Sequence, residues 1–196
     1  MNTARLEAVL AAIDAANAAD PRRTRDNDPV ELVYGRRMSA TLEKLAPGAS
    51  ELLKIAARGQ HIERWTSPRD SFPKDRVGYL KWRSALKDFH ARRVGELMAG
   101  AGYDTDEIAH VGALLRKERL KYDAEAQTLE DVACVVFLDN YFAEFSGLYD
   151  EDKVVAILQK TWAKMSPEGQ AAALALDLPA HARALVEAAL SGGQDG

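Results

Sequence analysis

The sequence has a single cysteine, Cys134, among 196 residues. One thiol excludes a disulfide within the chain and a zinc site built from cysteines. Long apolar runs are missing too, because no stretch approaches the roughly 20 residues that a membrane span needs. Glu7 and Asp14 interrupt the apolar N-terminal segment, which argues against a signal peptide. We therefore predict a cytoplasmic protein without a membrane partner.

Several motifs that mark common active sites are also absent. The sequence contains no GxxxxGKS or GxxxxGKT phosphate loop, no GxGxxG fingerprint, no GxSxG nucleophile elbow and no HExxH zinc motif. Cys134 lies inside the apolar run VACVVFL, residues 132–138, where a thiol is expected to be an inert core residue.

The charge is unevenly distributed along the chain. Residues 1–93 carry a net charge of +6 and residues 94–196 a net charge of −10, which gives −4 overall. The basic half could present a face to an anionic ligand, or the two halves could simply attract each other within one domain. An acidic chain without a stripe of Lys and Arg argues against nucleic-acid binding.

Apolar residues recur at intervals of three and four almost throughout, which is typical of helices. Asp28-Pro29-Val30-Glu31 predicts a helix start, with Asp28 as N-cap and Glu31 closing a capping box. We predict an all-α protein with a single helical domain of about eight helices over residues 1–190 and a flexible tail over 191–196. The expected helices cover about residues 6–19, 28–45, 50–65, 75–98, 104–115 and 123–145, with two or three shorter ones after them.

Three polar positions stand out within this helical pattern. His61 lies in ARGQHIERW, His90 lies in KDFHARR, and Glu130-Asp131 is expected to open the most apolar helix. Two imidazoles and a carboxylate from three helices suit a divalent ion such as Zn, Mn, Fe or Ni. Such an ion lowers the pKa of bound water and polarises a phosphate, which is hydrolase chemistry.

Each of these residues also has a purely structural interpretation. His61 or His90 alone could be a core or surface histidine that makes one hydrogen bond. Asp131 could close a capping box with Thr128 as N-cap. Basic residues near the histidines could bind a phosphate or could form a solvated helix face. The residues that we assign to an anionic substrate are Arg58, Gln60, Arg64 and Lys117.

Six segments resemble the family catalogued as domain of unknown function 4202, and together they cover the chain from about Ala12 to Leu190. The most specific of them is QTLEDVACVVFL, within residues 127–138. The family name implies no activity. The other segments are ELVYGRRMSATLEKL, AARGQHIERW, GYLKWRSALKDFHA, LLRKERLK and KTWAKMS.

A weaker resemblance is to the HD-domain metal-dependent phosphohydrolases, which are all-helical. It implies that His61 is the first histidine ligand, His90 the histidine of the His-Asp pair, and Asp131 the last aspartate ligand. Ala91 follows His90 where that pattern has an aspartate. Glu130 or a water would have to replace it. In another register, residues 90–118 match the first-histidine segment, Lys117-Glu118 takes the place of the pair, and the site is inactive.

We therefore expect an HD-like hydrolase that acts on a small phosphorylated metabolite or nucleotide. His61, His90 and Asp131 would hold the divalent ion, with Glu130 as fourth ligand or general base. The alternative is a helical bundle that binds a ligand or partner without catalysis, which Ala91 favours. A structural homodimer is the third hypothesis.

Overall fold

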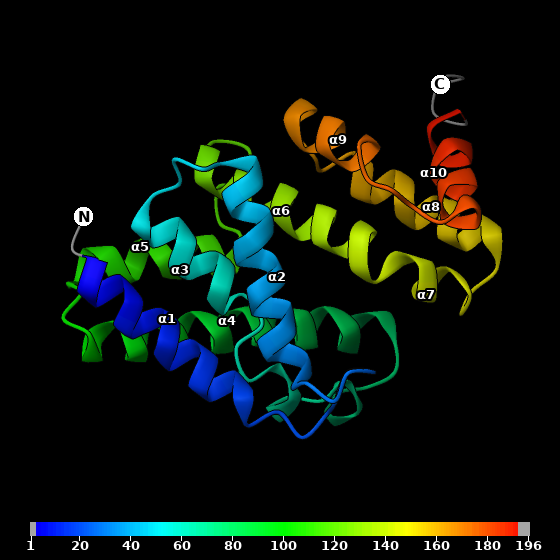
Figure 1. Cartoon of the computed structure of the whole chain (residues 1–196). Coiled ribbons are helices and arrows are strands. Elements are labelled where there is room, and N and C mark those ends of the chain that lie inside the picture. Colours follow the sequence, from blue (N-terminus) through cyan, green and yellow to red (C-terminus); the bar gives the residue numbers. More distant parts are fainter. Residues whose placement is uncertain (1–2, 192–196) are drawn as a thin grey trace. The chain divides into compact units, whose positions relative to one another are not determined.

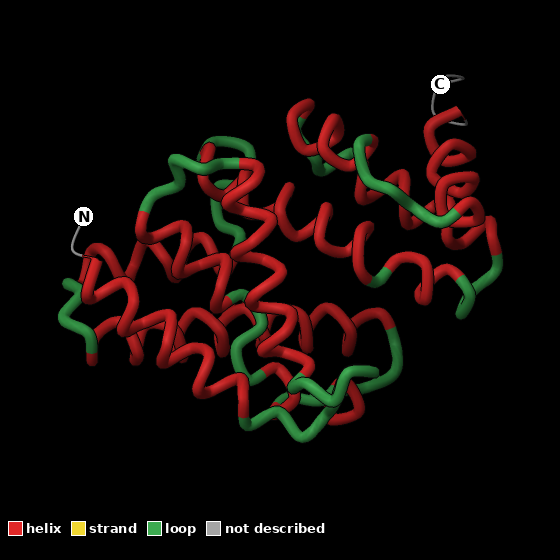
Figure 2. The backbone as a smooth tube through the Cα atoms, in the orientation of Figure 1, coloured by secondary structure: helices red, strands yellow, loops and turns green. Residues whose placement is uncertain are grey.

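The structure is a computed structural model that describes residues 3–191, and the flexible tail expected at 191–196 therefore lies almost wholly outside the described residues. Figure 2 shows helices and loops throughout the described part, which confirms the all-α prediction. The α-helices are α1 (Thr3–Ala18), α2 (Val30–Leu45), α3 (Glu51–Gly59), α4 (Arg76–Gly100), α5 (Thr105–Arg116), α6 (Ala124–Asn140), α7 (Phe142–Ser146), α8 (Glu151–Trp162), α9 (Pro167–Leu174) and α10 (Ala180–Ser191).

The helices form two compact units, one over residues 1–129 and the other over residues 130–196. Because each unit is compact in itself, the expected single domain over 1–190 stays a prediction. The structure also has more helices than the eight expected, since two expected helices are interrupted. None of the helices within residues 3–191 combines the length and the apolar character of a membrane span.

The first unit is built around α3, the short helix that packs against α1, α2, α4 and α5 (Figure 1). Six of its nine residues are buried, including Leu53 and Ile55. Because α3 is buried on nearly every side, it lies at the centre of the unit. The residues that follow it therefore start inside the core. The side chains that close around α3 include Val9, Ile13, Met38, Leu42, Val94, Met98, Val111 and Leu114.

Two capping boxes considered from the sequence are not formed. The residue before α2 is Pro29, which makes no side-chain cap, so Asp28 is not the N-cap and Glu31 closes no capping box. The helix α6 begins at Ala124, four residues before Thr128. Inside α6 the Thr128 hydroxyl donates to the Ala124 carbonyl, so the capping box expected there is wrong. Both Glu31 and Asp131 are therefore available for tertiary interactions.

Two helix ends also differ from the prediction. The helix expected over 50–65 ends at Gly59, and residues 64–66 form a 3₁₀ turn, η1 (Arg64–Thr66). Glu63 precedes η1 with φ of 49°, a left-handed conformation that cannot continue an α-helix. The helix expected to reach Phe145 breaks at Tyr141, where the backbone leaves the helical region.

The loop after η1 is held against the first turn of α4. It includes a second 3₁₀ turn, η2 (Arg69–Ser71), and Arg69 donates to the carbonyls of Phe72 and Pro73. The indole of Trp82, on α4, donates to the carbonyl of Ser67 at 3.0 Å. These bonds fix the path of the chain beside Arg64.

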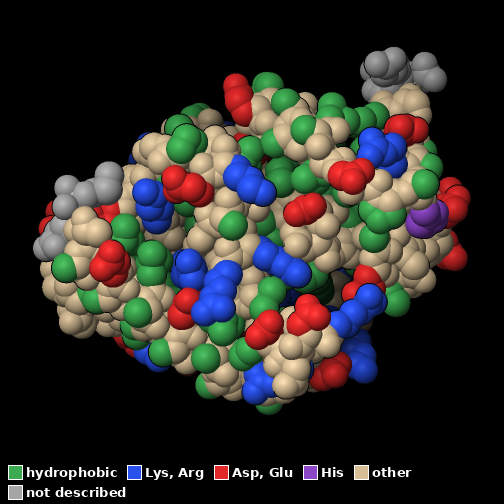
Figure 3. Space-filling view, viewed as in Figure 1, with side chains coloured by type: hydrophobic (Ala, Val, Ile, Leu, Met, Phe, Trp, Pro, Cys, Tyr) green, Lys and Arg blue, Asp and Glu red, His purple; other side chains and the backbone are tan. Residues whose placement is uncertain are grey.

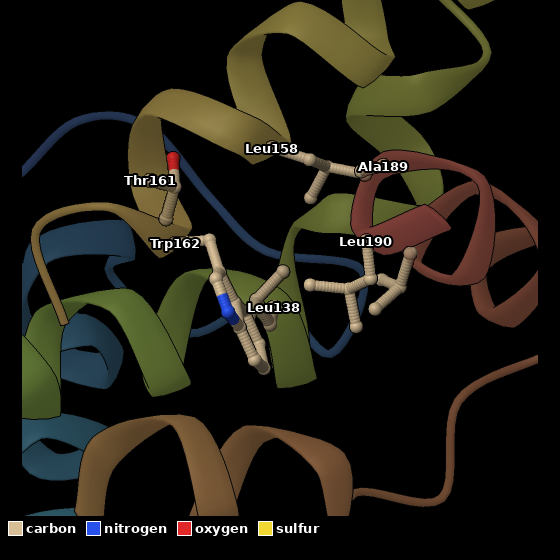
Figure 4. Close-up of a pocket in the computed structure, with 7 residues that line it drawn as sticks. Leu138, Leu158, Thr161, Trp162, Ala189 and Leu190 are labelled. Carbon is tan, nitrogen blue, oxygen red and sulfur yellow. The ribbon is translucent and has the colours of Figure 1, made fainter. Parts of the chain in front are cut away.

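The second unit contains the rest of α6 and helices α7 to α10, and α10 packs against α7 and α8. A small apolar pocket opens between α6, α8 and α10, with the Trp162 ring beside Leu138 (Figure 4). It has no charged lining residue, so it offers no acid–base or anion-binding group. The lining residues are Leu138, Leu158, Thr161, Trp162, Val186, Ala189 and Leu190.

Candidate functional site

Two buried carboxylates share one exposed arginine between the end of α1 and the start of α2. The Asp20 side chain is fully buried and accepts hydrogen bonds from Arg22 through its backbone (2.9 Å), Nε (3.0 Å) and Nη2 (2.8 Å). Its second oxygen also accepts from the backbone of Glu31 at 3.1 Å. Arg22 Nη2 donates to Glu31 Oε1 at 2.6 Å. The loop that joins α1 to α2 thus holds two carboxylates on one guanidinium.

The second oxygen of Glu31 faces His61. Glu31 Oε2 lies 3.6 Å from His61 Nδ1, and the glutamate side chain is only 4% exposed. The ring of Tyr34 stacks on the imidazole, with centroids 4.0 Å apart and planes inclined by 12°. The second ring nitrogen, His61 Nε2, accepts a hydrogen bond from Arg64 Nη1 at 3.0 Å. His61 is thereby held in one orientation by Glu31, Tyr34 and Arg64.

The turn after α3 brings His61 and Arg64 together. A Cβ at Gly59 would meet Val94 Cγ2 at 2.5 Å, so only glycine allows α3 to approach α4 this closely. Asn17 Oδ1 then accepts from the Glu63 backbone at 2.9 Å and anchors the turn to α1. Gln60 and Arg64 are four residues apart and would share one helix face if the helix continued. The end of the helix at Gly59 instead gives Arg64 a hydrogen bond to His61.

Arg64 differs from the other arginines around it in its surroundings. Its side chain is half-buried, and its guanidinium lies 5.1 Å from the centre of the Trp82 ring. Among residues 3–191 it has no carboxylate within ion-pair distance. Burial lowers the pKa of Arg64, the negative charge of Glu31 opposes this change, and the positive charges of Arg83 and Arg22 add to it. The pKa stays below its ordinary value, so the nearby charges do not offset the cost of burying this guanidinium.

His90, on α4, lies beside His61 with its ring centroid 6.0 Å away. Its Nδ1 lies 2.9 Å from the carbonyl oxygen of Ile62. A carbonyl can only accept, so Nδ1 carries the proton and Nε2 is the acceptor in the neutral ring. His90 Nε2 is buried and has no hydrogen-bond partner among the described residues.

Both histidines are neutral at neutral pH. Burial lowers the pKa of His61 to about 4, and the positive charges of Arg64 and Lys117 act in the same direction against the carboxylate of Glu31. Burial lowers the pKa of His90 to about 3, with a smaller contribution from the charge of Arg64. Glu31 has a pKa below its ordinary range, because His61 and Arg22 outweigh the effect of its burial.

The other substrate residues that we predicted have different surroundings. Arg58 donates to both carboxylate oxygens of Asp14 and to the Ser39 hydroxyl, so it ties α3 to α1 and α2. Gln60 is buried, and its Oε1 has no partner in the described part of the chain. Lys117 ends α5 with φ of 59°, and its charge acts on His61.

Glu130 and Asp131 belong to the second unit, where they lie inside α6 and not at its start. Asp131 accepts from the Ser166 backbone at 2.9 Å and from the Ser166 hydroxyl at 2.6 Å. That hydroxyl in turn accepts from the backbone of Gly169, so Asp131 supports the N-terminus of α9. The predicted ligand set of His61, His90 and Asp131 draws on both units and stays a prediction.

The side chains of the first unit give a divalent ion little support. Among residues 3–191, no three His, Cys, Asp or Glu side chains form a group that could hold a metal ion. Both nitrogens of His61 face protein groups, Glu31 and Arg64, so this ring offers no free lone pair.

Sequence reasoning missed four residues of this site: Asp20, Arg22, Glu31 and Tyr34. Asp20 and Arg22 looked like loop residues, and Glu31 was assigned to a capping box. The sequence places Asp20 just after α1, before Pro21, but nothing in the sequence indicates that this side chain is buried. Charges that are eleven residues apart meet only because the loop folds back, with a bridge between Arg23 and Pro29.

The surface around these helices has mixed charge. On the face shown in Figure 3, Lys and Arg side chains are interspersed with Asp and Glu. A ligand that binds through charge would therefore be recognised locally, by a cluster such as that of Arg64, and not by an extended basic surface.

Comparison with known proteins gives one match. The model of a family described as Domain of unknown function (DUF4202) matches residues 7–186. No curated protein and no solved structure matches the chain.

Proposed function

This chain belongs to that family, and we propose that its first unit binds the phosphoryl group of a small phosphorylated metabolite at Arg64 and His61. The observation that carries the proposal is the half-buried guanidinium of Arg64, which has no carboxylate partner in the described part of the chain. Arginine presents several N–H donors in a planar fork that matches two oxygens of a phosphate.

The neighbouring groups prepare Arg64 for an anion. Arg22 forms the ion pairs of both Asp20 and Glu31, and the surplus negative charge of Glu31 acts on Arg64 only through space, without an ion pair. The guanidinium lies over the Trp82 ring and against the neutral His61, neither of which neutralises it. A bound phosphate would give Arg64 a directly hydrogen-bonded anion and accept the donors that His61 does not use.

The experiment is calorimetric titration of the full chain with inorganic phosphate and with propyl phosphate. We expect Arg64→Ala to weaken the binding of both by about 30-fold, because a hydrogen bond to a charged group is worth roughly 2 kcal/mol. Arg64→Lys keeps the charge but loses the planar fork, so its affinity for phosphate should lie between that of the wild type and that of Arg64→Ala.

Arg92→Ala is the matched control, since Arg92 is an exposed arginine of the same unit that pairs with Glu96. It should bind both phosphates like the wild type. Wild-type protein that binds neither phosphate at millimolar concentration, or an Arg64→Ala variant that binds as tightly as the wild type, would overturn the proposal.

Hydrolysis of the bound phosphate ester is a second candidate, and the arrangement of Glu31 and His61 favours it. Glu31 faces Nδ1, so Nε2 is the acceptor nitrogen of the neutral ring. It accepts from Arg64 in the free protein, and it would become a proton acceptor only when a bound phosphate draws that guanidinium away. A bound dianion beside His61 would raise the pKa of the ring above its value of about 4 in the free protein. In this role His61 accepts the proton of an attacking water.

The metal-dependent form of that hydrolysis rests on the HD-domain resemblance, with His61, His90 and Asp131 as ligands. Elemental mass spectrometry of the untagged protein, beside a His61→Ala/His90→Ala variant, separates the two forms. Because Arg64 occupies Nε2 of His61, we expect the protein to stay without bound metal after incubation with Mn, Fe, Zn or Ni. About one ion per chain, lost in the double variant, would establish the metal-dependent form instead.

A further inference from the structure

The buried Nε2 of His90 is an acceptor without a donor. The side chain of His90 is among the buried polar groups, at 4% exposure, and its other nitrogen is committed to the carbonyl of Ile62. Buried polar atoms are nearly always hydrogen-bonded, so an unpaired one beside a candidate site calls for a partner that the protein chain does not supply.

The surroundings of His90 restrict what that partner is. An ammonium group is disfavoured, because it would lie close to the guanidinium of Arg64, which donates to the neighbouring ring of His61. A metal ion would need further ligands, and no group of three suitable side chains forms among residues 3–191. A neutral donor fits best, and a hydroxyl is the simplest neutral donor.

The position of His90 relative to His61 connects this donor to the proposed phosphate. The two rings contact each other, with centroids 6.0 Å apart, so a donor to His90 would lie next to the candidate phosphate site. His61 is 24% exposed and His90 is buried, so His90 is the deeper of the two. A molecule with a phosphoryl group at one end and a hydroxyl a few atoms away matches this order.

We infer that the ligand is a hydroxylated phosphate monoester of the polyol or sugar phosphate class, with its phosphoryl group at Arg64 and a hydroxyl that donates to His90 Nε2. This inference rests on the proposed phosphate site. Gln60, the residue before His61, adds a second buried acceptor without a partner, Oε1, which a further hydroxyl could satisfy.

The test compares two probes that share a three-carbon chain. Glycerol 3-phosphate carries two hydroxyls and propyl phosphate carries none. In calorimetric titrations we expect the wild type to bind glycerol 3-phosphate about tenfold more tightly than propyl phosphate. The ratio should fall to about one in His90→Phe, and His90→Gln, which keeps an acceptor, should retain most of it.

A second measurement does not depend on the folding of a variant. In wild-type protein labelled with ¹⁵N, the His90 Nε2 resonance should shift upon addition of glycerol 3-phosphate and not upon addition of propyl phosphate. This shift reports a new hydrogen bond at that atom, and circular dichroism of the two variants shows whether they are folded.

The outcomes separate this inference from the proposal on which it rests. If both probes bind equally and the resonance does not move, the inference is wrong and the phosphate site stands. If neither probe binds, the phosphate site itself fails. A preference for glycerol 3-phosphate that survives in a folded His90→Phe variant would place the hydroxyl elsewhere and overturn the role of His90.

Discussion

Replacing Asp20 by alanine should lower the free energy of unfolding by about 3 kcal/mol, because it removes a buried carboxylate that accepts four hydrogen bonds and leaves a buried N–H unpaired. The carboxylate has no exposed surface and accepts three hydrogen bonds from Arg22 and one from the backbone of Glu31. Without it, the Glu31 N–H stays buried and unpaired. Urea denaturation measures the change.

The control for this variant is Asp26→Ala, which removes an exposed aspartate from the same loop. We expect its free energy of unfolding to stay within about 0.5 kcal/mol of the wild type. A loss in Asp20→Ala as small as that in the control would show that the network contributes nothing measurable.

The lowered pKa of Asp20 also predicts how the stability of the protein depends on pH. Burial alone would raise the pKa of this carboxyl, but the hydrogen bonds from Arg22 and from the Glu31 backbone hold it below its ordinary value of 3.8. The stabilisation is therefore complete above about pH 4 and is lost as the pH falls through the lowered pKa. The free energy of unfolding of the wild type should decline more steeply below pH 4 than that of Asp20→Ala.

Replacing Gly78 by alanine should destabilise the first unit by about 3 kcal/mol, at the upper end of the effect of overpacking. A Cβ at Gly78 would lie 2.1 Å from the carbonyl oxygen of Pro73 and 2.8 Å from its carbonyl carbon. These are backbone atoms of the loop that packs on α4, so no side-chain rotation relieves the contact. Thermal and urea denaturation both measure the loss.

Gly100→Ala is the matched control, since Gly100 is the last residue of the same helix. Nothing lies within 4 Å of a Cβ there, and alanine favours a helix over glycine by roughly 0.5–1 kcal/mol. This variant should be as stable as the wild type or more stable. Equal stability of Gly78→Ala and Gly100→Ala would contradict this prediction, because it would show that the loop at Pro73 moves away without a loss of stability.

Gly78→Ala should also weaken the binding of phosphate. Pro73 lies in the loop whose Ser67 carbonyl accepts from the indole of Trp82, and Trp82 lies under Arg64. A displaced loop would therefore disturb the surface on which the guanidinium rests. Comparison with Gly100→Ala in the same titration separates this effect from a general change in the protein.

The helical periodicity of the sequence predicted nearly all of the fold. The predicted helical class was correct, and so was the predicted helix start at Asp104, whose side chain caps the helix within three residues. The errors fall where a longer-range contact competes with a local one. Asp28 did not cap α2. The helix after Ser50 ended at Gly59, and the backbone of Glu63 beyond it donates to Asn17 on α1.

The candidate site was predicted only in part. Sequence alone indicated His61, His90 and Arg64, because histidine and arginine at core-like helical positions are unusual. It assigned Glu31 to a cap and left Asp20 and Arg22 in a polar loop. Their ion pairs join residues on different elements, and the spacing of residues along the chain carries no information about such pairs.

The sequence by itself determined the all-α class, most helix boundaries and the family, because these depend on local periodicity, capping and similarity along the chain. Only the tertiary structure decided which charges meet. The turn at Gly59 and Glu63 places His61 between Glu31 and Arg64, and the fold-back of the loop buries Asp20 with Arg22. The physical reason is burial, which decides whether a carboxylate, an imidazole or a guanidinium stays hydrated or needs a partner, and which arises only when distant segments pack.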